Sequence, residues 1–214
     1  MRWKTCLFAV LCLSIALVLV AKTRSTGDDV VEKKRPDSPD IGEYVFGYKE
    51  YGEIISVVKD WESRSSDLVE TGVYGRTPSG VDNFYFKIFN EKEVPEKRVL
   101  VTACIHGNEP WSTSTVLAYA GRLLSGYGKD ERMTRILDST EVCFVPVVSP
   151  ETYPHSRMVK GLDPNRDFPS SKSPEKSSVY PVESLRSLFL ELKPDAVLSG
   201  HTYGRLYLVR SEEH

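Results

Sequence analysis

The stretch Val99-Leu-Val-Thr-Ala-Cys-Ile105, followed directly by His106-Gly-Asn-Glu109, decides the fold of this chain. A run of apolar and β-branched residues that ends near a glycine is typical of a buried strand with a loop at its carboxyl end. Open α/β sheets place their binding sites at such strand ends. Because His106 and Glu109 are three residues apart, one turn can direct both side chains to the same point. An imidazole and a carboxylate are ligands that Zn²⁺ accepts.

Helices and strands alternate on both sides of this stretch. Apolar residues at helical spacing predict helices over 53–65, 113–124, 131–137 and 182–192. Apolar or alternating runs between turn-forming residues predict strands over 68–74, 83–89, 99–105, 141–148, 196–199 and 206–209. This alternation predicts an α/β fold with a mixed, mostly parallel sheet flanked by helices.

The amino-terminal segment has the pattern of a targeting signal. Arg2 and Lys4 precede an apolar run over residues 6–21 that is short for a membrane span. We therefore expect a signal peptide over residues 1–25, with an uncleaved anchor as the alternative. A charged, proline-containing linker over 26–43 and one domain over 44–214 follow. The expected location is secreted or periplasmic, with a membrane association only if the leader is uncleaved.

Composition narrows the class of protein further. The chain has 214 residues, of which 40% are hydrophobic and 27% charged, which is typical of a globular domain. Its formal net charge of −2 does not favour nucleic acid as a partner. Two cysteines, Cys104 and Cys143, lie beyond the leader, in predicted strands. Export would permit a disulfide between them, and two buried free thiols are an equal alternative.

Two further polar clusters follow predicted secondary-structure elements. Asn165-Arg166 lies in a long polar segment, and His201 comes directly after the predicted strand over 196–199. Because the carboxyl ends of parallel strands meet at one edge of a sheet, His201 can approach His106 and Glu109. Two histidines and a glutamate would complete a zinc site of the catalytic kind, with the fourth position open to water. The alternative for His201 is a hydrogen-bonded histidine at a strand end.

Five segments of the chain match a known set of motifs in order. They are His106-Gly-Asn-Glu109-Pro-Trp, Ser149-Pro-Glu-Thr-Tyr153, Gly161-Leu-Asp-Pro-Asn-Arg-Asp-Phe-Pro169, Pro181-Val-Glu-Ser184 and Ser199-Gly-His-Thr-Tyr-Gly204. In this order they resemble the motifs of the carboxypeptidase A-like zinc peptidases, or metallocarboxypeptidases. The resemblance runs from about residue 48 to the last residues of the chain.

The resemblance implies a zinc-dependent enzyme that removes carboxyl-terminal residues from peptides. It implies one Zn²⁺ per chain, bound by His106, Glu109 and His201. The other roles that it implies are these: Asn165 and Arg166 hold the terminal carboxylate of the substrate, Arg157 stabilises the oxyanion, and Tyr203 lines a substrate subsite. A guanidinium fork suits a carboxylate. Two alternatives stay open, because Arg157 can be a solvated loop cation and Tyr203 a core residue.

The chain also departs from the family pattern. Asp167 stands where the family has Asn, which places a negative charge beside the expected carboxylate-binding pair. The family's catalytic Glu lies well beyond the last zinc ligand, whereas this sequence stops at His214. We therefore expect a fragment, truncated after the last zinc ligand and lacking the general base. The alternatives are a non-catalytic module that binds zinc or peptides, and a deacylase of N-acyl amino acids on the same fold.

Overall fold

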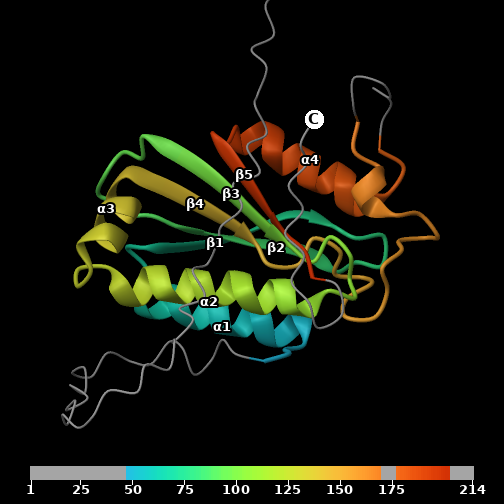
Figure 1. Cartoon of the computed structure of the whole chain (residues 1–214), viewed down its shortest axis with the longest axis horizontal. Helices are drawn as coiled ribbons and strands as arrows, with labels where there is room; N and C mark the ends of the chain where they lie inside the picture. Colours follow the sequence, from blue (N-terminus) through green and yellow to red (C-terminus); the bar gives the residue numbers. More distant parts are fainter. Residues whose placement is uncertain (1–46, 170–176, 203–214) are drawn as a thin grey trace, which may run out of the picture.

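The computed structural model describes residues 47–169 and 177–202 (Figure 1). Along the chain its elements are α1 (Tyr51–Arg64), β1 (Val69–Arg76), β2 (Asp82–Ile88), β3 (Lys97–Ala103), α2 (Pro110–Gly126), α3 (Glu131–Ser139), β4 (Thr140–Val145), the 3₁₀ turn η2 (Pro164–Arg166), α4 (Tyr180–Leu192) and β5 (Ala196–Gly200). The predicted leader, linker, Tyr203 and the strand over 206–209 lie outside the described residues. None of the described helices is long and apolar enough to cross a bilayer.

The strands form one sheet in the order β1-β2-β4-β3-β5. β3 pairs in parallel with β4 and β5, while β2 pairs in antiparallel fashion with β1 and β4. The short turn between β1 and β2 can only join antiparallel neighbours, whereas the helical crossovers around β3 permit parallel pairing. A mixed sheet flanked by helices, as predicted, is therefore confirmed, and among the described strands the two kinds of pairing are equally frequent.

Helices cover both faces of this sheet, with α1 and α2 on one side and α4 on the other (Figure 1). Successive residues of a strand point to opposite faces, so neighbouring residues of β4 belong to different cores. Phe144 stacks on Phe86 with ring centroids 4.9 Å apart in the core beneath α1 and α2. Cys143 packs on the α4 side, with Leu100 and Leu188. These two cores hold the central strands in place.

The elements begin and end close to the predicted positions, with three physical adjustments. The prediction that β3 extends through Ile105 is wrong, because Cys104 has a left-handed φ of 52° that stops the strand at Ala103. Helix α2 starts at Pro110, since proline has no N–H to leave unpaired at a first helical position. Strand β4 ends at Val145 because Pro146 cannot donate to the ladder.

Both cysteines of the domain are free, buried thiols. Burial raises the pKa of Cys104 to about 12 and that of Cys143 to about 12. The two thiols belong to different cores, on opposite faces of the sheet. Of the two alternatives that the sequence leaves open, the structure supports small buried side chains that contribute to packing.

A carboxylate ties the β1–β2 turn to the segment that follows β4. Oε1 of Glu151 accepts hydrogen bonds from the backbone N–H of Ser79 at 2.8 Å and from its hydroxyl at 2.5 Å. Partial burial alone would raise the pKa of Glu151, but the hydrogen bonds from Ser79 outweigh it and lower that pKa below its ordinary value. A carboxyl whose pKa is depressed by folding stabilises the fold only while it is ionised.

We therefore predict that Glu151→Gln reduces the free energy of unfolding near neutral pH, by less than about 1 kcal/mol because the site is exposed. The stabilisation is present above the ordinary pKa of 4.5 and is lost as the pH falls through the depressed value. Urea unfolding of both proteins at about pH 7 and about pH 3 should show the difference narrow in acid. The exposed Glu91 supplies the control, Glu91→Gln. A difference that grows in acid would contradict this account.

Candidate metal centre

The loop between β3 and α2 carries two of the predicted ligands. The left-handed backbone of Cys104 turns the chain away from the sheet, and the loop then closes on itself through a hydrogen bond from the N–H of Glu109 to the carbonyl of His106 at 3.1 Å. Gly107 lies against Thr152, where an added Cβ would collide with backbone atoms. The glycine is therefore required for the close approach of the loop to the segment after β4.

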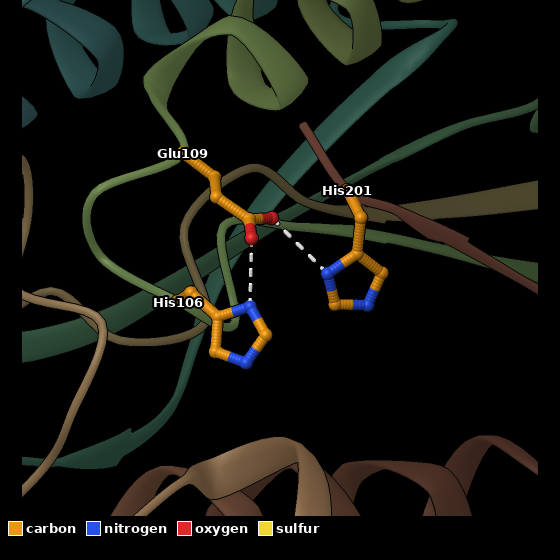
Figure 2. Close-up of side chains that lie close together, drawn as sticks. All are labelled: His106, Glu109 and His201. Atoms are coloured by element: carbon orange, nitrogen blue, oxygen red, sulfur yellow. Dashed lines mark hydrogen bonds and ion pairs between the residues drawn. The ribbon is translucent and has the colours of Figure 1, made fainter. Parts of the chain in front are cut away.

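The structure brings His106, Glu109 and His201 together at one edge of the sheet (Figure 2). Nδ1 of His106 lies 2.8 Å from Oε1 of Glu109, and Nδ1 of His201 lies 3.0 Å from Oε2 of the same carboxylate. One potential ligand atom from each residue falls within 4.8 Å of the others. His106 and Glu109 are 2% and 5% exposed, while His201 is half-buried. Of the three side chains, that of His201 is therefore the most accessible to solvent.

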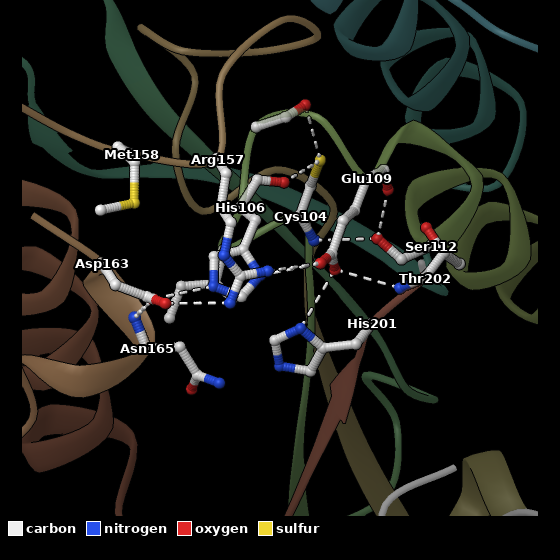
Figure 3. A network of polar contacts seen from close by, with 12 residues as sticks. Cys104, His106, Glu109, Ser112, Arg157, Met158, Asp163, Asn165, His201 and Thr202 are labelled. Carbon is white, nitrogen blue, oxygen red and sulfur yellow. Dashed lines mark hydrogen bonds and ion pairs between the residues drawn. The ribbon is translucent and has the colours of Figure 1, made fainter. Parts of the chain in front are cut away.

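Asp163, to which the sequence assigns no role, contacts the other side of His106 (Figure 3). Its Oδ1 lies 2.9 Å from Nε2 of His106 and also accepts the backbone N–H of Asn165 at 2.9 Å. Asp163 precedes the one-turn helix η2 as its N-cap, and an Asp before Pro-Asn in the sequence could have indicated that cap. A carboxylate at Nε2 fixes the orientation of the ring, so that Nδ1 faces the centre.

Both carboxylates of this network are held in their ionised form. Burial alone would raise the pKa of Glu109, but hydrogen bonds from His106, His201 and the backbone N–H of Thr202 lower it to about 2. For Asp163, too, burial acts to raise the pKa, while hydrogen bonds from His106, Arg157 and the N–H of Asn165 bring it to about 2. These two carboxylates outnumber the one guanidinium, that of Arg157, which contacts both of them. Apart from the histidines, the network therefore carries net negative charge, which favours a cation.

The predicted substrate-binding residues lie around this network. Nη2 of Arg157 lies 2.9 Å from Oδ2 of Asp163, and Nη1 lies 3.7 Å from Oε1 of Glu109. Asn165 is attached to the network through its backbone N–H, which donates to Oδ1 of Asp163 at 2.9 Å (Figure 3). Arg166 is exposed, and its guanidinium donates to the carbonyl of Asn165 at 3.1 Å.

Asp167, the residue that departs from the resembled motif, has a local partner. Its Oδ2 accepts the backbone N–H groups of Ser178 at 2.6 Å and Val179 at 2.8 Å, at the start of α4. A negative charge at a helix N-terminus is stabilising. The carboxylate therefore joins η2 to α4.

The donor set of this centre fits a zinc ion. It combines two imidazole nitrogens and one carboxylate, which is one of the three-ligand sets of catalytic zinc sites. The two Nδ1 atoms already face the two oxygens of Glu109 (Figure 2). The Asp163 contact at Nε2 of His106 provides the carboxylate partner that metal-binding histidines commonly have.

Comparison with known proteins points in the same direction. The sequence model of the zinc carboxypeptidase family matches residues 54–187, which is more than half of the chain. Carboxypeptidase D of Anas platyrhynchos is 25% identical over 131 residues, covering 50% of this chain and 9% of that protein. The inactive metallocarboxypeptidase ECM14 of Saccharomyces cerevisiae is 31% identical over 120 residues, covering 53% of this chain and 28% of that protein. The chain thus spans less than a third of either relative.

Solved structures share the fold. The crystal structure of thrombin-activatable fibrinolysis inhibitor superposes with a TM-score of 0.66 at 21% identity, covering 83% of this chain and 55% of the other. Carboxypeptidase A from Helicoverpa armigera gives a TM-score of 0.57 at 18% identity, covering 73% and 46% respectively. These likenesses concern the fold alone. Since some of the sequence relatives are named inactive, relatedness does not by itself establish turnover.

Proposed function

Because the chain belongs to the zinc carboxypeptidase family, we propose that it binds one Zn²⁺ through His106, Glu109 and His201 at a site for the carboxyl-terminal residue of peptides. The observation that carries this proposal is the single buried carboxylate that meets Nδ1 of both histidines, at 2.8 and 3.0 Å. When bound, Zn²⁺ supplies Lewis acidity to a substrate carbonyl and to a water molecule. Side chains of the protein would bind the substrate and stabilise the charge that develops on it.

We propose that Asn165 and Arg166 bind the terminal carboxylate of the peptide. The exposed guanidinium of Arg166 offers a planar fork of donors, and a carboxylate matches that fork with two parallel hydrogen bonds. The adjacent negative charge of Asp167 is engaged by two backbone N–H groups. Tyr203, the other proposed substrate residue, lies outside the described residues.

Arg157 is the proposed oxyanion-stabilising group. Asp163 holds one end of its guanidinium, while the other end lies 3.4 Å from Nδ1 of His106. A fixed cation at this position would stabilise negative charge that develops on the scissile carbonyl. Its side chain is 40% exposed, so a substrate can reach it.

Hydrolysis of a peptide bond also needs a general base that accepts a proton from the attacking water. In the part of the chain that the structure describes, the carboxylates in contact with the two histidines are Glu109 and Asp163. Each oxygen of these two carboxylates already has a partner, because those of Glu109 contact the two histidines and those of Asp163 contact His106 and Arg157. A general base needs an oxygen within hydrogen-bond reach of the water that it deprotonates. We propose that neither of them takes the proton from water during hydrolysis.

The metal proposal predicts about one zinc ion per folded chain, measured by elemental analysis after dialysis. His106→Ala should weaken zinc binding in a chelator competition by more than the roughly 10–100-fold that is typical of changes outside the ligand set. His155 is exposed and not part of the centre, so His155→Ala serves as the matched control and should bind zinc as the wild type does. Folded wild-type protein that binds no zinc would refute the proposal.

The substrate proposal predicts that the zinc-loaded chain binds a peptide with a free carboxyl terminus more tightly than the same peptide amidated. Arg166→Ala should remove most of that preference, about tenfold to a hundredfold in the dissociation constant, because a hydrogen bond to a charged group contributes about 1.5–3 kcal/mol. Titration calorimetry with both peptides measures the preference. Arg186→Ala, on the exposed surface of α4, is the control. Equal affinity of the wild type for the two peptides would rule out a carboxylate-binding role.

We also propose that the protein is exported. The positive residues Arg2 and Lys4 followed by the apolar run over 6–21 support this. Amino-terminal sequencing of the protein recovered outside the cytoplasm should find a first residue between positions 21 and 27 of the sequence. Protein that is found in the cytoplasm and retains Met1 would contradict the proposal.

A further inference from the structure

Ser112 lies where the segments that carry the three proposed zinc ligands meet (Figure 3). Its hydroxyl donates to the carbonyl of Glu109 at 2.7 Å and accepts the backbone N–H of Cys104 at 3.0 Å. On its other side lies Gly200, the residue before His201, at which an added Cβ would come within 3.6 Å of the Cβ of Ser112. One side chain that is 2% exposed therefore binds the residue after β3 and the ligand loop, and it lies beside the end of β5.

Cys104 closes the loop from the other side. Its thiol donates to the carbonyls of His106 at 3.2 Å and Gly107 at 3.5 Å. Its φ of 52° is one that residues with a side chain rarely adopt, so the surrounding contacts must maintain it. The hydroxyl of Ser112 binds the N–H of this same residue. The Ser112 hydroxyl and the Cys104 thiol together form a clamp around the loop from 104 to 109.

Helix α2, which starts after this loop, has no side-chain capping hydrogen bond from its N-cap residue. Glu109 is the N-cap of α2, yet its side chain makes no capping hydrogen bond because the carboxylate points to the two histidines. The backbone of Glu109 is held at its carbonyl, which accepts hydrogen bonds from the N–H of Ser112 at 3.0 Å and from its hydroxyl at 2.7 Å. The direction of the Glu109 side chain therefore depends on a backbone that Ser112 restrains.

We propose that Ser112 is a positioning residue of the zinc site, and that its hydroxyl, together with the Cys104 thiol, sets the direction of His106 and Glu109 toward His201. This inference rests on the proposed function, because it concerns the same zinc site. The buried hydroxyl of Ser112 makes two hydrogen bonds, to the N–H of Cys104 and to the carbonyl of Glu109. An alanine would fill most of the same space but would leave the N–H of Cys104 without its partner, at the residue whose backbone starts the loop.

The experiment compares zinc affinity and coordination geometry in matched variants of the whole chain. Ser112→Ala should weaken zinc binding by about tenfold in a chelator competition, the lower end of effects seen for residues outside the ligand set. It should also change the visible absorption of the Co²⁺-substituted protein, which reports the geometry of the ligands. Ser112→Thr keeps the hydroxyl and should restore both readouts. Ser114, whose hydroxyl donates to the carbonyl of Gly47 at 2.9 Å, provides the control, because Ser114→Ala should change neither.

The outcomes separate this inference from the proposed function. A wild-type chain that binds no zinc refutes the proposed function and the inference with it. A wild-type chain that binds zinc, with unchanged affinity and Co²⁺ spectrum in Ser112→Ala, overturns the inference alone. Should Ser112→Ala fail to fold, Cys104→Ala tests the other half of the clamp. Weaker zinc binding and an altered Co²⁺ spectrum in that variant support the clamp, and unchanged values overturn it.

Discussion

The hydrogen bonds from two histidines to the single carboxylate of Glu109 are the contact on which this edge of the molecule depends. They join the loop after β3 to the residue after β5, two segments that are far apart in the sequence. The contact is possible because β3 and β5 are adjacent and parallel, with Ala103 opposite Gly200 in the register. A shift of that register by one residue would turn the side chains to the other face of the sheet and separate His201 from the carboxylate. The sheet therefore determines the geometry of the centre.

A large part of this arrangement could be predicted from the sequence, for identifiable reasons. The buried strands are short apolar runs between turn residues, and the helices show regular apolar spacing, so their existence and order follow from local patterns. The meeting of His106 and His201 could be predicted because both follow strands that pair in parallel. Asp163 could not be assigned a contact in the same way, since its approach to His106 depends on the path of a loop without periodicity. The contact between Arg157 and Asp163 could not be predicted for the same reason, because Arg157 lies in the same polar segment.

The departure at Asp167 shows why a motif is better interpreted together with its contacts. Beside a cationic residue that is expected to bind an anion, an extra carboxylate suggests repulsion. In the structure that carboxylate accepts two backbone N–H groups at the start of α4. The carboxylate therefore lies at the N-terminus of that helix, where a negative charge is favourable. The same contact attaches η2, which carries Asn165 and Arg166, to a helix packed on the sheet. The substitution thus contributes to placing the pair that it follows.

Local rules are broken twice within the six residues from 104 to 109. Cys104 has a left-handed backbone, and Glu109 occupies an N-cap without capping its helix. Each of these features costs stability taken alone, and such conflicts are expected mainly at functional sites. Both have one geometric consequence, because together they direct an imidazole and a carboxylate toward a histidine from another strand. The conflict between local preference and observed structure is therefore itself an argument that this loop is a binding site.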